Sequence, residues 1–407
     1  MILANRGFVT DARSAASGKG LPGLRVIGEP IACESTVASD IESGVAGALD
    51  EVVAALTKPL TAEEKSPQVK LEKPPNIIFK GSLEDVNQFF YRKGWTDGLP
   101  VFAPTEEAVA EMMKGTDLPP DQMVTKLIPR MGKATVKKIA VNAVMAGALP
   151  IHMPVLIAAV QALSEKKTRF DTFEVSTGSW SPMFIINGQI RKDIHINCSS
   201  GALSPGNMAN SAIGRAVGLI VKNIGGARKG VEDMGTIGNP GKYSLVLGEN
   251  EEESPWAPLS VDRGFKKEDN TLTVFFPNNF GLAIPSATSP EGIADGLVSM
   301  QMRSLSALVV IPDHAQILFK GGWSKEKVKE YIAQKTAAGP NTRSRSVGLK
   351  PEDFILVVAG GPGTWMGAYR SAGGFENDFV SKKIELPKNW EALVAKYKNL
   401  VPVYEKY

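Results

Sequence analysis

The sequence predicts a mixed α/β fold, in which an incomplete N-terminal α/β arm precedes a large mixed-sheet domain. Short apolar runs bounded by glycine or proline alternate with longer amphipathic runs, as in chains whose strands alternate with helices. The length of 407 residues is long for one domain and favours two units. A charged stretch with three prolines, residues 61–76, is the predicted linker between them.

The N-terminal arm, residues 1–60, is expected to form a helix, a short strand and a longer helix. The first helix lies in residues 7–20 and ends at glycines, and LRVIG, residues 24–28, is the buried strand. The longer helix begins near Ser39 or Asp40, either of which can cap it. Its apolar face consists of Ile41, Val45, Leu49, Val52 and Val53. A single strand cannot stabilise such a unit, so the arm must pack on another surface.

The large domain, residues 77–407, continues the alternation of strands and helices. Thr105 is the expected cap of one helix, and the glycine pair at 225–226 closes another in the left-handed conformation. The predicted helices are 82–94, 105–115, 133–149, 154–167, 206–226, 291–304, 324–337 and 390–401. The predicted strands are 77–81, 173–180, 183–188, 194–197, 243–249, 271–276, 306–311 and the run that begins at Phe354.

Composition narrows the classes of function. The formal net charge is only +3 and no dense basic run occurs, so no nucleic-acid partner is expected. The longest apolar stretch, residues 139–160, is interrupted by polar residues and prolines, so no membrane span is expected. The two cysteines, Cys33 and Cys198, cannot build a disulfide framework, and a reducing cytoplasm is the simplest setting.

The stretch INCSSGALSPGNMANSAIGRA, residues 196–216, holds the strongest candidate for chemistry. Cys198 precedes a helix whose free N–H groups attract anions and lower the pKa of a nearby thiol. The bland alternative is a partly buried cysteine in a turn, and a third reading is a loop that binds only through its backbone. His195 could assist if the preceding strand ends before Cys198. Candidate anion-binding residues here are Ser199, Ser204, Gly206, Asn207 and Arg215, with Ser204 or Asn207 as the helix cap.

Three further stretches offer weaker candidates. His314 follows a strand and could carry a proton, although a histidine in that position is commonly structural. In GGPGTWMGAYRSAGG, residues 360–374, glycines allow close approach to a ligand, but the stretch matches neither a P-loop nor a dinucleotide fingerprint. Its candidate binding residues are Gly361, Gly363 and Arg370, and those of IPRMGKATVKK are Arg130 and Lys133. An ordinary loop and a solvated helix start are the respective alternatives.

The acidic run GENEEESPWAPL, residues 248–259, has no calcium-loop spacing and is expected to be a solvated face or a surface for a basic partner. The three histidines are far apart, and no His/Cys cluster has zinc spacing. We therefore expect no metal held by the protein, and the sequence leaves an organic cofactor open.

Residues 1–60 resemble the C-terminal end of the UGSC-motif family, a thioredoxin-related group named for a selenocysteine- or cysteine-containing motif. The matching patterns are F-x-x-x-A, GLPGLRVI and ALDEVVAALT. Residues 90–382 resemble the large region that accompanies that domain, through WTDGLPVFAPT, PRMGKATVKKIAVNAVMAGALP, ANSAIGRAVGLIVKNIGGA, GNPGKYSLVLGENEEESPW, the HAQ…GWSKEKV segment and VVAGGPG. The UGSC sequence itself does not occur here. The resemblance implies a redox or thiol-dependent theme and a hetero-oligomer, with the motif on a separate subunit or in a longer ancestral chain. It assigns Cys33 no catalytic role.

Three functional hypotheses follow. The first is a subunit of a cytoplasmic thiol-dependent or redox enzyme, a reductase or carbon–heteroatom lyase, that acts on a small anionic organic substrate. In it Cys198 is the nucleophile or redox thiol, His314 or His195 carries protons, and Arg130 and Arg215 hold the anion. The second is a thiol-independent hydrolase or hydro-lyase. The third is a non-catalytic structural or binding subunit of a homo- or hetero-oligomer.

Overall fold

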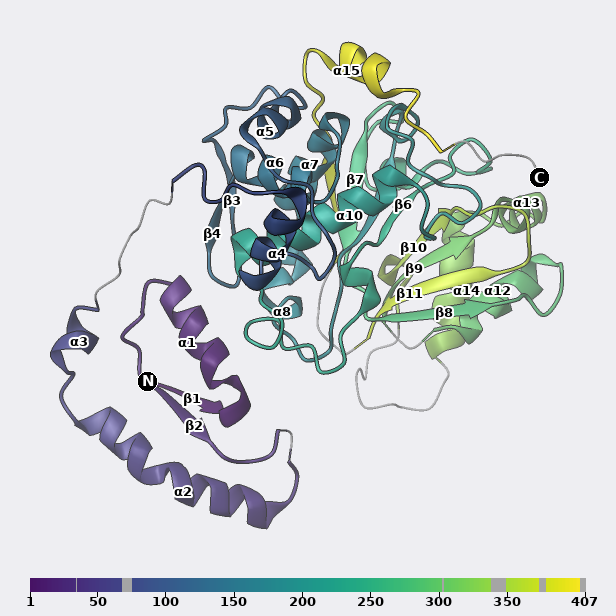
Figure 1. The fold of residues 1–407 in the computed structure, drawn as a ribbon. Helices are drawn as coiled ribbons and strands as arrows, with labels where there is room; N and C mark the ends of the chain where they lie inside the picture. The colour runs from purple at the N-terminus through teal and green to yellow at the C-terminus, as the bar shows by residue number, and fades with distance from the viewer. Residues whose placement is uncertain (34, 68–74, 302–303, 338–348, 373–377, 403–407) are drawn as a thin grey trace.

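A computed structural model describes residues 1–33, 35–67, 75–301, 304–337, 349–372 and 378–402, and it confirms the mixed α/β class (Figure 1). Within these residues the large domain is built on two four-stranded sheets and a two-stranded hairpin, and the N-terminal arm contains a two-stranded sheet. Both larger sheets mix parallel and antiparallel pairs.

The N-terminal arm contains two strands rather than the single one predicted. β1 (Ile2–Asn5) pairs in parallel with β2 (Val26–Glu29), and η1 (Arg6–Phe8) and α1 (Val9–Gly18) connect them. The longer helix, α2 (Ala38–Thr57), is present, but Val37 stands at its N-cap without a side-chain hydrogen bond. The predicted capping by Ser39 or Asp40 is therefore wrong, because both residues lie inside the first turn.

The apolar stripe predicted on α2 faces solvent. The helix packs instead through small residues: Gly44 and Ala48 are buried, and a Cβ at Gly44 would lie 2.2 Å from a carbon of Ile31. The exposed large apolar side chains of the helix and its N-cap are Val37, Ile41, Val45, Leu49, Val53 and Leu56. A glycine and an alanine one turn apart allow close approach to the arm, and this approach turns the larger side chains outward.

Part of the predicted linker folds onto the N-terminal arm. Residues Ala62–Lys65 form α3, which begins with a capping box at Thr61. The Arg25 guanidinium donates to both carboxylate oxygens of Glu64, at 2.7 and 2.8 Å. The arm meets the large domain through α1, where Ser14 Oγ donates to Glu232 Oε1 at 2.5 Å.

The first sheet of the large domain has the strand order β12–β7–β5–β6, with β5 and β6 parallel. Its strands are β12 (Val380–Lys383), β7 (Thr271–Phe275), β5 (Met183–Asn187) and β6 (Val246–Gly248). The helices α6 (Val136–Met145), α7 (Met153–Leu163) and α10 (Met208–Ile220) share one apolar core with this sheet. α10 continues into a π-helical turn, Val221–Gly225, and ends at the predicted left-handed Gly226.

Smaller elements complete the large domain. They are α4 (Leu83–Arg92), α5 (Glu106–Met113), the hairpin β3 (Met123–Leu127) and β4 (Gly132–Thr135), α8 (Phe170–Phe173), α9 (Ile190–Asp193), α11 (Leu259–Asp262) and α15 (Trp390–Tyr397). Short turns are Pro150–His152, Lys166–Thr168, Pro240–Lys242 and Pro351–Asp353. Thr105 Oγ1 accepts from the Ala108 N–H, which confirms it as the cap of α5.

The second sheet has the order β10–β9–β11–β8. Its strands are β10 (Phe354–Val358), β9 (Leu305–Val310), β11 (Met366–Ser371) and β8 (Asn279–Ala283). One face packs on α12 (Pro290–Ser299), α13 (Pro312–Lys320) and α14 (Lys325–Ala337). The other face shares a core with the first sheet, where Ile185 and Phe275 meet Val357 and Tyr369. The two sheets therefore enclose one apolar layer between them.

Three predicted strands are wrong. Residues 77–81 are irregular and exposed, and prolines precede them in the sequence. Residues 173–180 contain the end of α8 followed by turns, and residues 194–197 leave α9 through a left-handed His195 with φ of 58°. In each case a short apolar run packs on the core as a turn or remains exposed.

Candidate functional site

A cleft opens where the parallel strands β5 and β6 end. The chain after β5 forms α9 and the cysteine loop, and the chain after β6 forms the acidic run. The cleft has a volume of about 560 Å³. Its lining residues are Arg191, Lys192, His195, Ile196, Asn197, Cys198, Asn207, Glu252, Val401 and Pro402. Carboxyl ends of neighbouring strands are the usual position of ligand sites in sheets with parallel strands.

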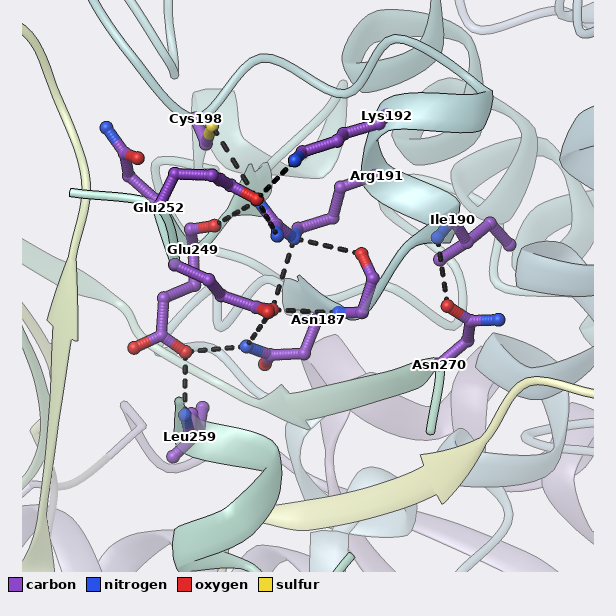
Figure 2. Close-up of polar contacts among 12 residues, drawn as sticks. Asn187, Ile190, Arg191, Lys192, Cys198, Glu249, Glu252, Leu259 and Asn270 are labelled. Carbon is purple, nitrogen blue, oxygen red and sulfur yellow. Dashed lines mark hydrogen bonds and ion pairs between the residues drawn. The ribbon is translucent and has the colours of Figure 1, made fainter. Parts of the chain in front are cut away.

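Arg191 is the buried cation of this cleft. Gly188, with φ of 92°, turns the chain out of β5, and a Cβ there would lie 2.6 Å from Asn270 Oδ1. The guanidinium is 3% exposed, and its Nε lies 3.1 Å from both the Gly188 carbonyl and Glu251 Oε1. Its Nη1 donates to the Glu249 carbonyl oxygen at 2.6 Å (Figure 2). Arg191 is thus fixed from behind by the ends of both strands.

The outer edge of the Arg191 guanidinium holds the carboxylate of Glu252. Nη1 donates to Oε2 at 3.2 Å and Nη2 to Oε1 at 3.1 Å, and Lys192 Nζ lies 2.9 Å from Oε1 (Figure 2). Partial burial works against the charge, but the two cations outweigh it and hold the pKa of Glu252 at about 2. This is a bidentate arginine–carboxylate pair inside a cleft.

Glu249 lies beneath the cleft and is fully buried. Its Oε2 accepts from Asn187 Nδ2 at 2.6 Å and from the Leu259 N–H at 2.7 Å. Lys325 Nζ stands 3.6 Å from Oε1. Burial raises the pKa of Glu249 above its ordinary value, although Lys325 opposes the shift. The acidic run is therefore not the solvated face that we expected, because Glu249 and Glu251 join the framework beneath Arg191.

Cys198 lies at the cleft with its Sγ 3.9 Å from Arg191 Nη1. Burial raises the pKa of this thiol, and Glu252 adds to the shift, although Arg191 works in the opposite direction. The predicted lowering of the thiol pKa by the helix N-terminus is therefore wrong, because desolvation outweighs the favourable charges. The resting side chain is a protonated thiol at neutral pH.

The loop after Cys198 leads into α10, as predicted, but its capping differs. Asn207 stands at the N-cap without a capping bond, and its Oδ1 accepts from Asn197 Nδ2 at 3.1 Å instead. Asn210 Oδ1 accepts from the Asn197 N–H at 2.8 Å and so ties the loop to the helix. The remaining candidates of the loop are exposed, and the cleft lining does not include them: they are Ser199, Ser204 and Gly206.

The two histidine candidates separate. His195 lines the cleft, and its Nε2 lies 2.9 Å from the Lys398 carbonyl oxygen. Because a carbonyl only accepts, Nε2 carries the proton and Nδ1 of the neutral ring can accept one. His314 is buried on α13 and does not line the cleft. Burial lowers the pKa of His314, although Asp313 opposes the shift, so this ring is not the proton carrier of the cleft.

The other predicted anion-binding side chains lie elsewhere. Arg215 on α10 donates to both carboxylate oxygens of Asp97, at 2.7 and 2.9 Å, and to the Pro100 carbonyl, so it anchors a loop. Arg370 is buried on β11, where it donates to the Met300 carbonyl and to Asn279 Oδ1. Arg130 and Lys133 are exposed on the hairpin of β3 and β4 and its turn. None of these four lines the cleft.

The glycine loop after β10 supports the cysteine loop from the second sheet. The Gly360 N–H donates to the Cys198 carbonyl oxygen at 2.9 Å. A Cβ at Gly361 would lie 1.7 Å from Ser200 Oγ, and Gly363 has φ of 153°. Gly361 is thus required by a close approach to the protein's own chain. None of these three glycines lines the cleft.

Sequence reasoning missed Arg191 and the role of the acidic run. The signal was present: an arginine stands three residues after a buried strand that ends in glycine, and a run with four glutamates begins at the end of another buried strand. Charges placed at the ends of buried strands meet at one edge of a sheet when the strands are parallel neighbours. That neighbourhood of β5 and β6 is a tertiary fact that local spacing does not carry.

Comparisons with protein-family models, curated proteins and solved structures find no match to this chain. Within the described residues, no three or more His, Cys, Asp or Glu side chains form a group that could hold a metal ion. No helix in the described part of the chain has the length and apolar character needed to cross a bilayer.

Proposed function

We propose that this chain is an enzyme, or a subunit of one, that binds a small organic anion in the cleft and acts on it with the Cys198 thiol. One observation carries the proposal: Cys198 Sγ lies 3.9 Å from a buried guanidinium at the wall of an open cleft. Clefts of this size accept small organic molecules, and a buried arginine fork matches the geometry of a carboxylate.

The chemistry assigned to the cleft is that of a nucleophilic or redox thiol. Since the resting thiol is protonated, it must lose a proton before it reacts. Nδ1 of His195 is the acceptor proposed for that proton, in place of His314. Reduction or cleavage of a carbon–heteroatom bond remains the proposed reaction class, and the UGSC resemblance supports its thiol theme. A reduced thiol suits a cytoplasmic setting.

Competitive alkylation tests the proposal, because Cys33 is exposed in the N-terminal arm and serves as an internal control. We expect iodoacetate to be favoured over iodoacetamide at Cys198 by about fivefold relative to Cys33, as a charge attraction of ~1 kcal/mol predicts. Rates are read from the two peptides by mass spectrometry. Cys198→Ser confirms the assignment of the peptide, and Lys192→Gln should reduce the preference. Equal preferences for iodoacetate at the two cysteines would contradict the proposal that the cleft beside Cys198 binds an anion.

A second role belongs to the N-terminal arm, which we propose binds a partner subunit. The apolar stripe on α2 carries this role, since Val45, Leu49 and Leu56 are each more than half exposed. Exposed apolar patches of this kind mark interaction sites. The partner is a second copy of the chain or, as the family resemblance implies, a UGSC-motif subunit.

Native mass spectrometry of the assembly purified from its own source tests the role of the arm. Leu49→Glu should release the partner by placing a charge in the interface. The matched control is Leu83→Glu, at a leucine on α4 in the large domain that is 67% exposed against 54% for Leu49, and it should leave the assembly intact. An unchanged mass with Leu49→Glu would contradict the proposal.

A further inference from the structure

The carboxylate of Glu252 lies in the cleft where a substrate carboxylate would sit. Arg191 does not need it for support, because the Gly188 and Glu249 carbonyls and Glu251 Oε1 hold the guanidinium from behind. The two nitrogens that face the cleft, Nη1 and Nη2, meet the two oxygens of Glu252 (Figure 2). This outer edge is a preformed seat for one carboxylate.

Glu251 and Glu252 are neighbours in the chain, yet only one of them is built into the framework. The Glu251 side chain is 15% exposed, and its Oε1 also accepts from Asn187 Nδ2 and the Gly188 N–H. The Glu252 side chain is 43% exposed, and its side-chain partners are Arg191 and Lys192. Water can solvate Glu252 as soon as it leaves the guanidinium, whereas Glu251 would leave two donors unsatisfied.

We infer that Glu252 is an internal placeholder, which a small carboxylate ligand displaces from Arg191 when it binds beside Cys198. The inference rests on the function proposed above and names its substrate class: a small organic acid whose reactive atom lies one or two carbons from its carboxylate.

Exchange of one carboxylate for another keeps the balance of charge. An unpaired buried guanidinium is costly, so a cleft that simply opened would be unstable. A ligand carboxylate restores the same two hydrogen bonds to Nη1 and Nη2, and the released Glu252 returns to water. The 3.9 Å separation between Nη1 and Cys198 Sγ then places the first carbons of the ligand next to the thiol. Because Glu252 competes for the seat, it weakens ligand binding by mass action.

Protection of Cys198 from iodoacetamide tests this inference, with acetate and succinate as probes and acetamide as the neutral control. We compare the wild-type chain with Glu252→Gln, which keeps the size of the side chain and removes its charge. The half-protecting concentration of both acids should fall about tenfold in this variant. Glu253→Gln is the matched control, because Glu253 belongs to the same run but bonds to Asn250 rather than to Arg191. In this control variant the half-protecting concentrations of both acids should equal those of the wild type.

Equal half-protecting concentrations in the wild type and Glu252→Gln would overturn the placeholder and leave the proposed function standing. Failure of both acids to protect Cys198 in every protein, together with equal alkylation preferences at the two cysteines, would overturn both. Tryptophan fluorescence during urea unfolding shows whether each variant is folded. Should Glu252→Gln not fold, Glu252→Ala repeats the comparison, and it is expected to lower the half-protecting concentration in the same direction.

Discussion

The N-terminal arm and the large domain each contain a long apolar helix, but the two helices differ in how much of their apolar surface the rest of the chain buries. α7 lies between the first sheet and neighbouring helices, and nearly every one of its side chains is buried. α2 rests on a two-stranded sheet and buries only Gly44 and Ala48. Apolar periodicity therefore predicts a helix, but it does not predict whether the same chain covers the apolar face. A two-stranded sheet offers too little surface to cover a helix of this length.

This difference in burial suits the two regions to different functions. The large domain brings two strand ends, a buried arginine and a thiol together, and such preorganisation needs a rigid core. The N-terminal arm has few buried groups and presents an apolar stripe, which suits a part that is completed by association. The following predictions test this division, beginning with the larger effect.

Truncation of one leucine in each region gives the largest contrast. Leu156 on α7 is fully buried, so Leu156→Ala should lower the free energy of unfolding by about 3 kcal/mol. Leu49 on α2 is 54% exposed, and Leu49→Ala should change it by less than about 0.5 kcal/mol. Urea unfolding followed by circular dichroism measures both, and tryptophan fluorescence reports the large domain alone, because all 6 tryptophans lie there.

A large loss of stability with Leu49→Ala in the isolated chain would break the comparison. It would mean that the stripe on α2 is covered within the chain or by a second copy. Repeating the measurement at a tenfold lower protein concentration separates the two cases, since only an assembly loses stability on dilution.

Local signals were sufficient for most helices and for five of the buried strands of the large domain: β5, β6, β7, β9 and β10. The threonine cap at Thr105 and the left-handed glycine at Gly226 fix helix ends through bonds within a few residues. Strands β8 and β11 were missed, because Asn279–Ala283 and Met366–Ser371 contain glycine, alanine and polar residues rather than β-branched ones. β11 pairs with β9, and β8 pairs with β11, so both strands are stabilised by a tertiary effect.

The site was predicted only in its cysteine loop. Cys198 and His195 lie at the cleft. Arg215 and Arg370 do not line it, and their guanidinium groups donate to structural acceptors instead. Side-chain charge is visible in a sequence, whereas its partner is not. An arginine is available to a ligand only when the fold leaves part of its guanidinium facing a cleft, as it does for Arg191.

The smaller predicted effect is a pH dependence of stability, which tests whether water reaches a buried histidine at the start of α7. His152 is fully buried, and its Nδ1 accepts from the Leu149 N–H at 3.1 Å. Burial, with a smaller contribution from His195, lowers the pKa of His152 from 6.5 to about 3. Below pH 6.5 the His152 ring therefore binds a proton in the unfolded chain but not in the folded chain. The free energy of unfolding should fall with pH through this window, by ~2 kcal/mol between pH 6.5 and 5.

His152→Asn isolates this contribution, because an asparagine oxygen can accept the Leu149 N–H but does not titrate. The variant is expected to be less stable at neutral pH, and to lose less stability than the wild type on acidification to pH 5. The N-terminal arm contains no histidine, so the difference between the two slopes of unfolding free energy against pH should be visible in the tryptophan fluorescence of the large domain. Parallel slopes for the two proteins would show that water reaches His152. The large domain would then share the open packing of the arm at the helix that forms its core.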